Sequence, residues 1–303
     1  MKFRKKEKTR FGLCFDYTSF ERFKKKFMYK IGLSVGSFQA TEEMFQTYQK
    51  VGLSAIEVSH SINQHLEADD FPHFAQWSKE YGIRLWSYHL PFMDPELKFD
   101  ISDPKTAEAT IARFFELIEQ GAQAGFEKFI IHPSFEPIGD TDRPIRMERA
   151  KQSLRVLTEF AEKNGVTICV ENLPRTCLGR NSAEILELIS VHPALRVCFD
   201  TNHVLKESYV DFLHALGDKI VTLHVSDYDF IDEKHWLPGE GLVDWKLMYE
   251  TIRQSGYDGV WMYEINFHND KIQRVRDLTC EDFVRNANEI FEGAPLTSLL
   301  PKT

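Results

Sequence analysis

An aspartate and a histidine follow a short apolar run in the segment LRVCFDTNHVL, residues 195–205. Asp200 closes the run, and His203 lies three positions further along. Isolated acids and histidines at such positions are commonly caps or surface hydrogen-bonding groups. The same side chains also bind divalent cations and transfer protons in enzymes. The choice between these interpretations depends on what the other apolar runs carry at the same point.

Most of the other apolar runs also end in a histidine or a carboxylate. The residues concerned are His89, His132, Glu171 and Glu264, which close their runs, and His224, which lies near the end of its run. If these ends meet, several like charges lie close together unless a cation neutralises them. The set holds imidazole and carboxylate but no thiolate, which suits Mn²⁺, Zn²⁺, Co²⁺ or Mg²⁺. The pattern predicts a divalent-metal centre with Asp200 as a ligand, while His203 contacts substrate or helps to hold another ion.

A second polar segment, LHVSDYDFIDEKHWLPGEGLVDW, begins at Leu223. It carries Glu233 and His235 before the turn-forming PGEG, and such a loop is also typical of a solvated acidic surface. Because it follows an apolar run, it would lie over the same end of a parallel sheet, where Trp236 could supply an apolar wall.

Eight short runs rich in β-branched and aromatic residues alternate with segments of helical periodicity. The predicted strands are 30–35, 55–60, 83–89, 128–132, 166–171, 196–200, 220–225 and 260–264, and the predicted helices are 41–51, 71–81, 104–124, 146–164, 182–191, 208–216, 245–255 and 280–292. Thr41, Ser182 and Asp244 are expected N-caps, and glycines end several helices before the next strand. The pattern predicts a single-domain α/β protein, a (β/α)₈ TIM barrel, with an open doubly wound sheet as the alternative. Active sites of such barrels lie at the carboxyl ends of the strands, where the histidines and acids fall.

The composition argues against nucleic acids and membranes as partners. The net charge is −9 and the pI about 5.7, which argues against a broad phosphate-binding surface and therefore against nucleic acid. No apolar run approaches the roughly 20 residues of a membrane span. The five cysteines are odd in number and two lie inside apolar runs, which suits a reducing cytoplasm. Residues 1–29 form a basic extension ahead of a catalytic domain over 30–293 and a tail over 294–303, and we hypothesise that the working enzyme begins near Met28.

From about Lys30 to about Phe291 the chain resembles the xylose isomerase-like barrel superfamily. This group holds sugar phosphate isomerases and epimerases, inosose dehydratases and endonuclease IV-type apurinic endonucleases. The resemblance is carried by IEVSH, YHLPF, IIHPS, VENLPRT, CFDTNH, LHVSDYD, HWLPGEG and MYEI. It implies a divalent-metal-dependent isomerase or epimerase of a sugar, sugar acid or polyol, and leaves open whether that substrate is phosphorylated. Relatives are often dimers or tetramers, so a homo-oligomer is also open.

The resemblance further implies a role for each residue. The metal quartet is Glu171, Asp200, His224 and Glu264. Glu171 and Glu264 are also the acid–base pair, which moves a proton beside a carbonyl whose enediolate charge the metal stabilises. The remaining substrate-binding candidates are His89, His132, His203, Glu233, His235, Glu240 and Trp236.

Two other branches of the superfamily stay open. An inosose-type dehydratase would use the same metal and a similar proton abstraction. An endonuclease IV-like enzyme would hold three zinc ions, and here Glu233 stands where that branch has an aspartate in an Asp-x-His pair with His235. Many epimerases carry an arginine soon after the histidine that matches His224, whereas residues 225–245 offer only Lys234 as a base.

Overall fold

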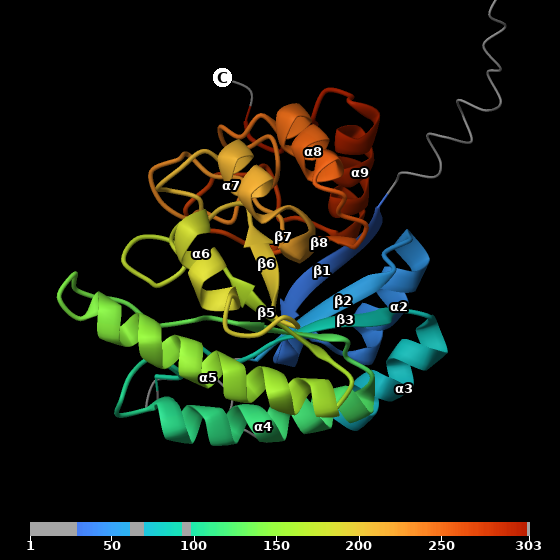
Figure 1. The fold of residues 1–303 in the computed structure, drawn as a ribbon. Coiled ribbons are helices and arrows are strands. Elements are labelled where there is room, and N and C mark those ends of the chain that lie inside the picture. Colours follow the sequence, from blue (N-terminus) through green and yellow to red (C-terminus); the bar gives the residue numbers. More distant parts are fainter. Residues whose placement is uncertain (1–28, 61–69, 93–97, 302–303) are drawn as a thin grey trace, which may run out of the picture.

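A computed structural model of the chain describes residues 29–60, 70–92 and 98–301. Within these ranges eight parallel strands alternate with helices in chain order, which confirms the predicted α/β barrel (Figure 1). The strands are β1 (Lys30–Gly36), β2 (Ala55–Ser59), β3 (Arg84–His89), β4 (Lys128–Ile131), β5 (Thr167–Glu171), β6 (Arg196–Asp200), β7 (Ile220–His224) and β8 (Val260–Tyr263). The helices are α2 (Glu42–Val51), α3 (Phe71–Tyr81), α4 (Ala107–Ala124), α5 (Arg143–Lys163), α6 (Ser182–Ile189), α7 (Tyr209–Leu216), α8 (Trp245–Gln254) and α9 (Cys280–Glu292), with 3₁₀ turns η1 (Ser37–Gln39) and η2 (Gly217–Lys219).

The strands form one sheet that closes on itself. The ladder runs in the order β7-β6-β5-β4-β3-β2-β1-β8, and every pair is parallel. Its two ends meet just beyond β7, where the amide of Val225 donates to Met262 O at 2.8 Å and the amide of Glu264 donates to Val225 O at 3.2 Å. Because all strands point the same way, their carboxyl ends share one rim.

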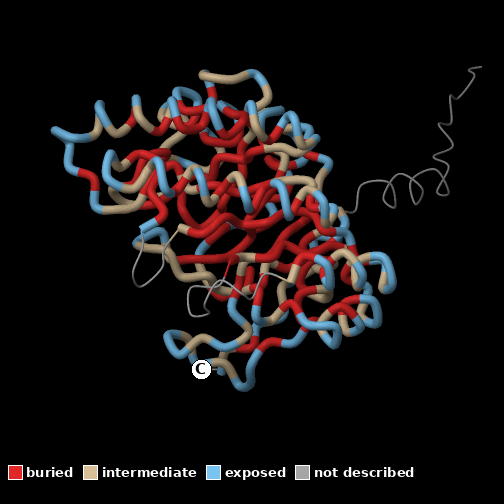
Figure 2. Tube along the Cα trace, turned by 90° about the horizontal axis from the view of Figure 1, so that it is seen from below, coloured by how far each residue is buried: buried red, intermediate tan, exposed pale blue. Residues whose placement is uncertain are grey.

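Strand alternation decides which side chains face the barrel interior. In β8, Trp261 and Tyr263 pack in the main core against the helices, whereas Val260 and Met262 belong to a small separate cluster inside the barrel. The next residue, Glu264, continues the interior series. The same two-residue period in β5 and β6 places Glu171 above Cys169 and Asp200 above Cys198. Figure 2 shows the buried strands running through the centre of the molecule.

Two of the three predicted helix N-caps are confirmed, and the third is wrong. The side chains of Thr41 and Asp244 accept bonds from the third amide of α2 and α8, as predicted. Ser182 is not the N-cap of α6. Asn181 has the extended backbone of a cap and accepts from the Glu184 amide at 2.9 Å, while the Ser182 hydroxyl donates to Glu207 at 2.8 Å.

Three predictions fall wholly or partly outside the described residues: the start of the working enzyme near Met28, the basic extension over 1–29 and the tail over 294–303. Tyr29 is described and stacks on Trp261 with ring centroids 6.0 Å apart. Up to residue 301 the tail is also described, and its Leu299 carbonyl accepts from the Val275 amide at 2.9 Å. Among the described helices, none has the length and apolar character needed to cross a bilayer.

Candidate metal centre

Four side chains from neighbouring strand ends converge at the rim of the barrel. Glu171 ends β5, Asp200 ends β6, His224 ends β7, and Glu264 follows β8. Nδ1 of His224 lies 3.2 Å from Oε1 of Glu171, 3.3 Å from Oε2 of Glu264 and 3.9 Å from Oδ2 of Asp200. One ligand atom from each residue lies within 4.8 Å of the others, which is the spacing expected around a single bound ion. The structure therefore brings together all four residues of the predicted quartet.

Unsatisfied oxygens provide a test of whether this group fits a cation. Oδ2 of Asp200 and Oε2 of Glu264 are buried, and neither has a hydrogen-bond partner among the residues that the structure describes. A buried carboxylate oxygen without a partner is costly, and a bound cation removes that cost. The donor set of three carboxylates and one imidazole matches the ligands of Mn²⁺, Zn²⁺, Co²⁺ and Mg²⁺. These residues fit a divalent metal ion.

The protonation states show how strongly the four groups interact. Burial raises the pKa of Asp200 well above its usual range, and Glu264 and Glu171 add to this effect against the opposing charge of His203. Burial acts in the same direction on Glu171, but His224 and His132 outweigh it and hold the pKa of Glu171 well below its usual range. The pKa of Glu264 is lowered in the same way by His224. Without a cation, one carboxyl of the quartet is thus driven towards its neutral form.

Glu171 also belongs to a second group of possible ligands with His89 and His132. Its Oε2 lies 3.1 Å from Nε2 of His89 and 3.2 Å from Nε2 of His132. The other ring nitrogen of His89 donates to the Leu90 carbonyl at 2.9 Å, which fixes the ring. Phe92 stacks on His132 with centroids 4.5 Å apart. The two histidines thus lie directly against the quartet.

His203, Glu233 and His235 form a third group, with one ligand atom from each within 4.8 Å of the others. Nε2 of His203 lies 3.2 Å from Oε2 of Glu233, while its Nδ1 donates to the Asn172 carbonyl at 2.9 Å. The hydrogen bond from His203 lowers the pKa of Glu233 to about 2. His235 has a φ of 52° and contacts the Glu264 carbonyl through Nδ1 at 3.1 Å. Glu233, where the endonuclease branch has aspartate, thus lies at ion-pair distance from His203 and within 4.8 Å of a ring nitrogen of His235.

Arg175, in the loop after β5, is a rim residue that the sequence prediction missed. Its guanidinium donates to Glu136 at 2.8 Å, Asp232 at 2.7 Å and Glu233 at 3.0 Å, and so connects the loops after β4, β5 and β7. The pattern VENLPRT contains this arginine, but its partners lie 39 to 58 residues away in the chain. Arg175 thus supplies a basic side chain at the rim of the barrel. It comes from the loop after β5 and not from the loop after β7, where many epimerases carry an arginine.

Asp227 holds the loop after β7 in place. This buried carboxylate accepts from the amides of Gly239 and Val243 at 2.8 and 3.1 Å and from the indole of Trp245 at 2.8 Å. A side chain at Gly241 would collide with Asp227 Oδ1 and with the Tyr228 carbonyl oxygen. The turn PGEG therefore needs glycine at this close approach.

Glu240 and Trp236, two of the predicted substrate-binding residues, lie in this loop and contact other groups of the protein. Both oxygens of Glu240 accept from the guanidinium of Arg274, at 2.8 and 2.7 Å. Trp236 pairs its backbone with Asp227, and its indole nitrogen is buried without a hydrogen-bond partner among the described residues. A role for either residue in binding substrate stays a prediction.

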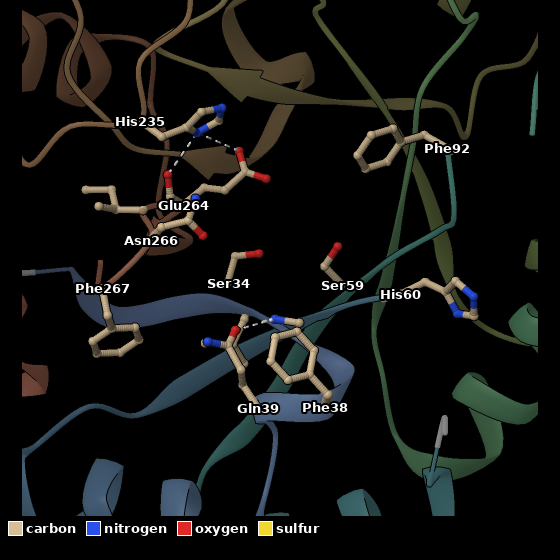
Figure 3. Close-up of a pocket in the computed structure, with 13 residues that line it drawn as sticks. Ser34, Phe38, Gln39, Ser59, His60, Phe92, His235, Glu264, Asn266 and Phe267 are labelled. Carbon is tan, nitrogen blue, oxygen red and sulfur yellow. Dashed lines mark hydrogen bonds and ion pairs between the residues drawn. The ribbon is translucent and has the colours of Figure 1, made fainter. Parts of the chain in front are cut away.

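A pocket of about 390 Å³ opens beside the quartet (Figure 3). Glu264 and His235 lie on one side of it, Phe92 on the other, and Ser34 and Ser59 between them. Phe38, Gln39, His60, Asn266 and Phe267 complete most of its lining. Aromatic walls with a few hydroxyl and amide groups suit a small polar molecule that also has apolar faces, such as a carbohydrate.

Glu57 is a second residue that the sequence prediction missed. It lies in the middle of β2, fully buried, with Oε1 2.9 Å from Nε2 of His224. Burial acts to raise its pKa, but the charge of His224 outweighs burial and lowers it. The signal was present as a lone charged residue inside the apolar run AIEVSH. The position of Glu57 in the middle of the strand, and not at or beyond the carboxyl end, separates it from the pattern of strand-end ligands.

Comparison with known proteins identifies the family of the chain. The sequence model described as "Xylose isomerase-like TIM barrel" matches residues 45–281. The chain is 26% identical over 260 residues to an uncharacterized protein of Methanocaldococcus jannaschii, covering 82% of this chain and 87% of that protein. It is 28% identical over 149 residues to fructoselysine 3-epimerase of Escherichia coli O157:H7, covering 44% and 54%. Among solved structures, a D-tagatose 3-epimerase-like protein superposes with a TM-score of 0.70 at 20% identity, covering 86% of this chain and 96% of that chain.

Proposed function

The chain belongs to the xylose isomerase-like TIM barrel family, and from this premise we propose that it is a divalent-metal-dependent isomerase or epimerase of a sugar, sugar acid or polyol. The proposal rests on one observation: Glu171, Asp200, His224 and Glu264 converge beside a pocket whose aromatic and polar lining suits a carbohydrate. The relatives named as fructoselysine 3-epimerase and D-tagatose 3-epimerase-like protein support the same class of reaction.

The proposed reaction moves a proton at a carbon next to a carbonyl group. Glu171, Asp200, His224 and Glu264 would hold a divalent ion, which would stabilise the negative charge that develops on the carbonyl oxygen. Glu264, whose side chain is 25% exposed and lines the pocket, would take the proton from the substrate carbon. Glu171, 1% exposed and held in its ionised form, would first take a proton from the imidazole of His89, whose Nε2 lies 3.1 Å from Oε2 of Glu171. It would then deliver that proton to the same carbon for epimerisation or to its neighbour for isomerisation.

The other residues would bind and orient the substrate. The Nε2 atom of His203 faces Glu233 in this structure, and either group could instead bond a substrate hydroxyl. Phe38, Phe92 and Phe267 would cover the apolar faces of the sugar. Whether the substrate carries a phosphate stays open, although the described residues that line the pocket include no lysine or arginine.

The test is a substrate panel in heavy water. Protein stripped of metal is reloaded with Mn²⁺, Co²⁺ or Mg²⁺ and incubated with ketoses, their phosphates, sugar acids and inososes, with proton NMR and mass spectrometry as readouts. We expect a new isomer or epimer that carries solvent deuterium at the reacting carbon. The matched control is Glu264→Gln, which keeps the shape of the side chain but cannot accept the proton. Loss of water from an inosose would indicate a dehydratase instead.

A second candidate is a zinc-dependent apurinic endonuclease, and one observation favours it. Besides the quartet, three further groups of possible ligands lie among the described residues, and Glu171 belongs to three of the four groups. In this alternative the centre would hold several zinc ions and activate water for phosphodiester hydrolysis. A zinc-loaded protein that cuts a labelled duplex at an abasic site, and leaves the whole carbohydrate panel unchanged, would replace the first proposal with this one.

A further inference from the structure

Glu57 is a buried carboxylate inside the barrel that the proposed reaction does not use. It is fully shielded from solvent, and its two neighbours in the barrel wall hold both of its oxygens. The hydroxyl of Ser34 on β1 donates to Oε1 at 2.7 Å, and the hydroxyl of Ser87 on β3 donates to Oε2 at 2.5 Å. A carboxylate is costly to bury, and two dedicated donors fix this one in a single orientation.

The charged group that Glu57 meets is the imidazole of His224. The two residues come from β2 and β7, which are separated around the barrel by β1 and β8. Nε2 of His224 lies 2.9 Å from Oε1 of Glu57, and it has no aligned hydrogen bond to any residue that the structure describes. The opposite ring nitrogen, Nδ1, faces Glu171, Asp200 and Glu264. The ring thus lies between one carboxylate behind it and three in front of it.

We propose that Glu57 is a positioning residue for the metal centre: it takes the Nε2 proton of His224 as a hydrogen bond and so directs the lone pair of Nδ1 to the ion. This inference rests on the cation site of the proposed function. A neutral imidazole carries one proton, so an acceptor at Nε2 selects the tautomer whose Nδ1 is free to bind metal. The two serines keep that acceptor from rotating away. Ser34 also lines the pocket. Its hydrogen bond to Glu57 therefore connects the lining of the pocket to the metal ligand His224.

The experiment compares metal affinity in three variants. Glu57→Gln keeps the size and most hydrogen bonds of the side chain but removes its charge. Ser87→Ala removes one donor that orients Glu57. Asp282→Asn is the matched control, because Asp282 is an equally buried carboxylate that pairs with Arg276 and Arg285 at α9 and is not among the grouped metal ligands of the described chain. Each protein is stripped, and Mn²⁺ and Co²⁺ affinities are measured by competition calorimetry.

We expect Glu57→Gln to weaken Mn²⁺ binding by about 10- to 100-fold, the usual effect of losing the partner of a metal-bound histidine. Ser87→Ala should weaken it less, and Asp282→Asn should leave it unchanged. The visible spectrum of bound Co²⁺ should also change in Glu57→Gln, since the field of the imidazole ligand is altered. A purely structural role for Glu57 would lower thermal stability in chelator without moving either readout.

Unchanged metal affinity and an unchanged Co²⁺ spectrum in Glu57→Gln would overturn the inference. If that variant does not fold, an affinity in Ser87→Ala equal to that of the unmodified protein would overturn it as well. A protein that binds no metal before any substitution would overturn both this inference and the proposed cofactor. The protein could also bind metal, lose affinity in Glu57→Gln and yet convert no carbohydrate. That result would contradict the proposed reaction and leave this inference standing.

Discussion

Replacing Asp200 by asparagine should affect the metal-free and metal-loaded proteins in opposite ways. In the metal-free protein Oδ2 of Asp200 is buried without a hydrogen bond among the described residues, near two other carboxylates. Its pKa is raised well above the usual range by burial and by those neighbours, so its ionised form costs folding free energy at neutral pH. Asparagine cannot ionise and removes this cost. In chelator we therefore expect the variant to be as stable as the unmodified protein to within about 1 kcal/mol, or more stable.

With metal present the sign reverses. At free Mn²⁺ of about 1,000 times the dissociation constant, binding stabilises the unmodified protein by about 4.1 kcal/mol. For a domain of this size each kcal/mol corresponds to roughly 2–4 °C, so the melting temperature should rise by about 8–16 °C. If Asp200→Asn weakens binding about 100-fold, the same Mn²⁺ concentration leaves only about 1.4 kcal/mol of stabilisation.

The assay is thermal unfolding in chelator and in Mn²⁺, with Asp282→Asn as the control. Asp282 accepts hydrogen bonds from the guanidinium of Arg276 and forms an ion pair with Arg285, so its loss should destabilise the protein in both solutions and leave the metal-induced shift intact. A full metal-induced shift in Asp200→Asn would refute its role as a ligand. A large loss of stability of this variant in chelator would refute the argument that its charge is unfavourable without metal.

Three further predictions concern catalysis, the β7–α8 loop and pH. On any carbohydrate that the protein converts, Glu171→Gln and Glu264→Gln should each lower kcat/KM by at least about 100-fold, and near-normal kinetics in either variant would remove that residue from the acid–base pair. Gly241→Ala should cost about 1–3 kcal/mol in urea denaturation because a methyl group there collides with Asp227 and the Tyr228 carbonyl; equal stability would show that the loop can shift freely. The pKa of Asp282 is lowered from 3.8 to about 2, so its contribution to stability is present above pH 3.8 and lost as pH falls towards 2. In urea denaturation the gap between unmodified protein and Asp282→Asn should therefore narrow below pH 3.8, and a gap independent of pH would contradict the pairing.

The fold and the convergence of histidines and acids at the strand ends could be predicted because both depend on local patterns, whereas the choice of these four residues as the quartet came from the family resemblance. A period of two residues in β5, β6 and β8 decides that Glu171, Asp200 and Glu264 face the interior, and this period is visible in the sequence. Parallel strands then bring these positions to one rim. The error at the start of α6 has a similar local cause, because Asn181 and Ser182 are both good caps and only the backbone conformation distinguishes them.

The contributions of Glu57 and Arg175 could not be predicted because they depend on distant partners. Glu57 meets His224, 167 positions further along the chain, and only the closure of the barrel brings them into contact. Arg175 has a φ of 52° and meets carboxylates from two other loops. Propensity and spacing within one segment contain no information on such pairings. The same holds for Glu240, whose partner Arg274 lies beyond β8.

The proposed function requires that Glu171, Asp200, His224 and Glu264 hold a catalytic divalent ion. The most direct measurement is the metal content per chain of protein purified without chelator, determined by elemental analysis for the unmodified protein and for Asp200→Asn. We expect one tightly held divalent ion per chain, restored after stripping and lost in the variant. Absence of any bound divalent metal, or equal metal content in Asp200→Asn, would contradict it.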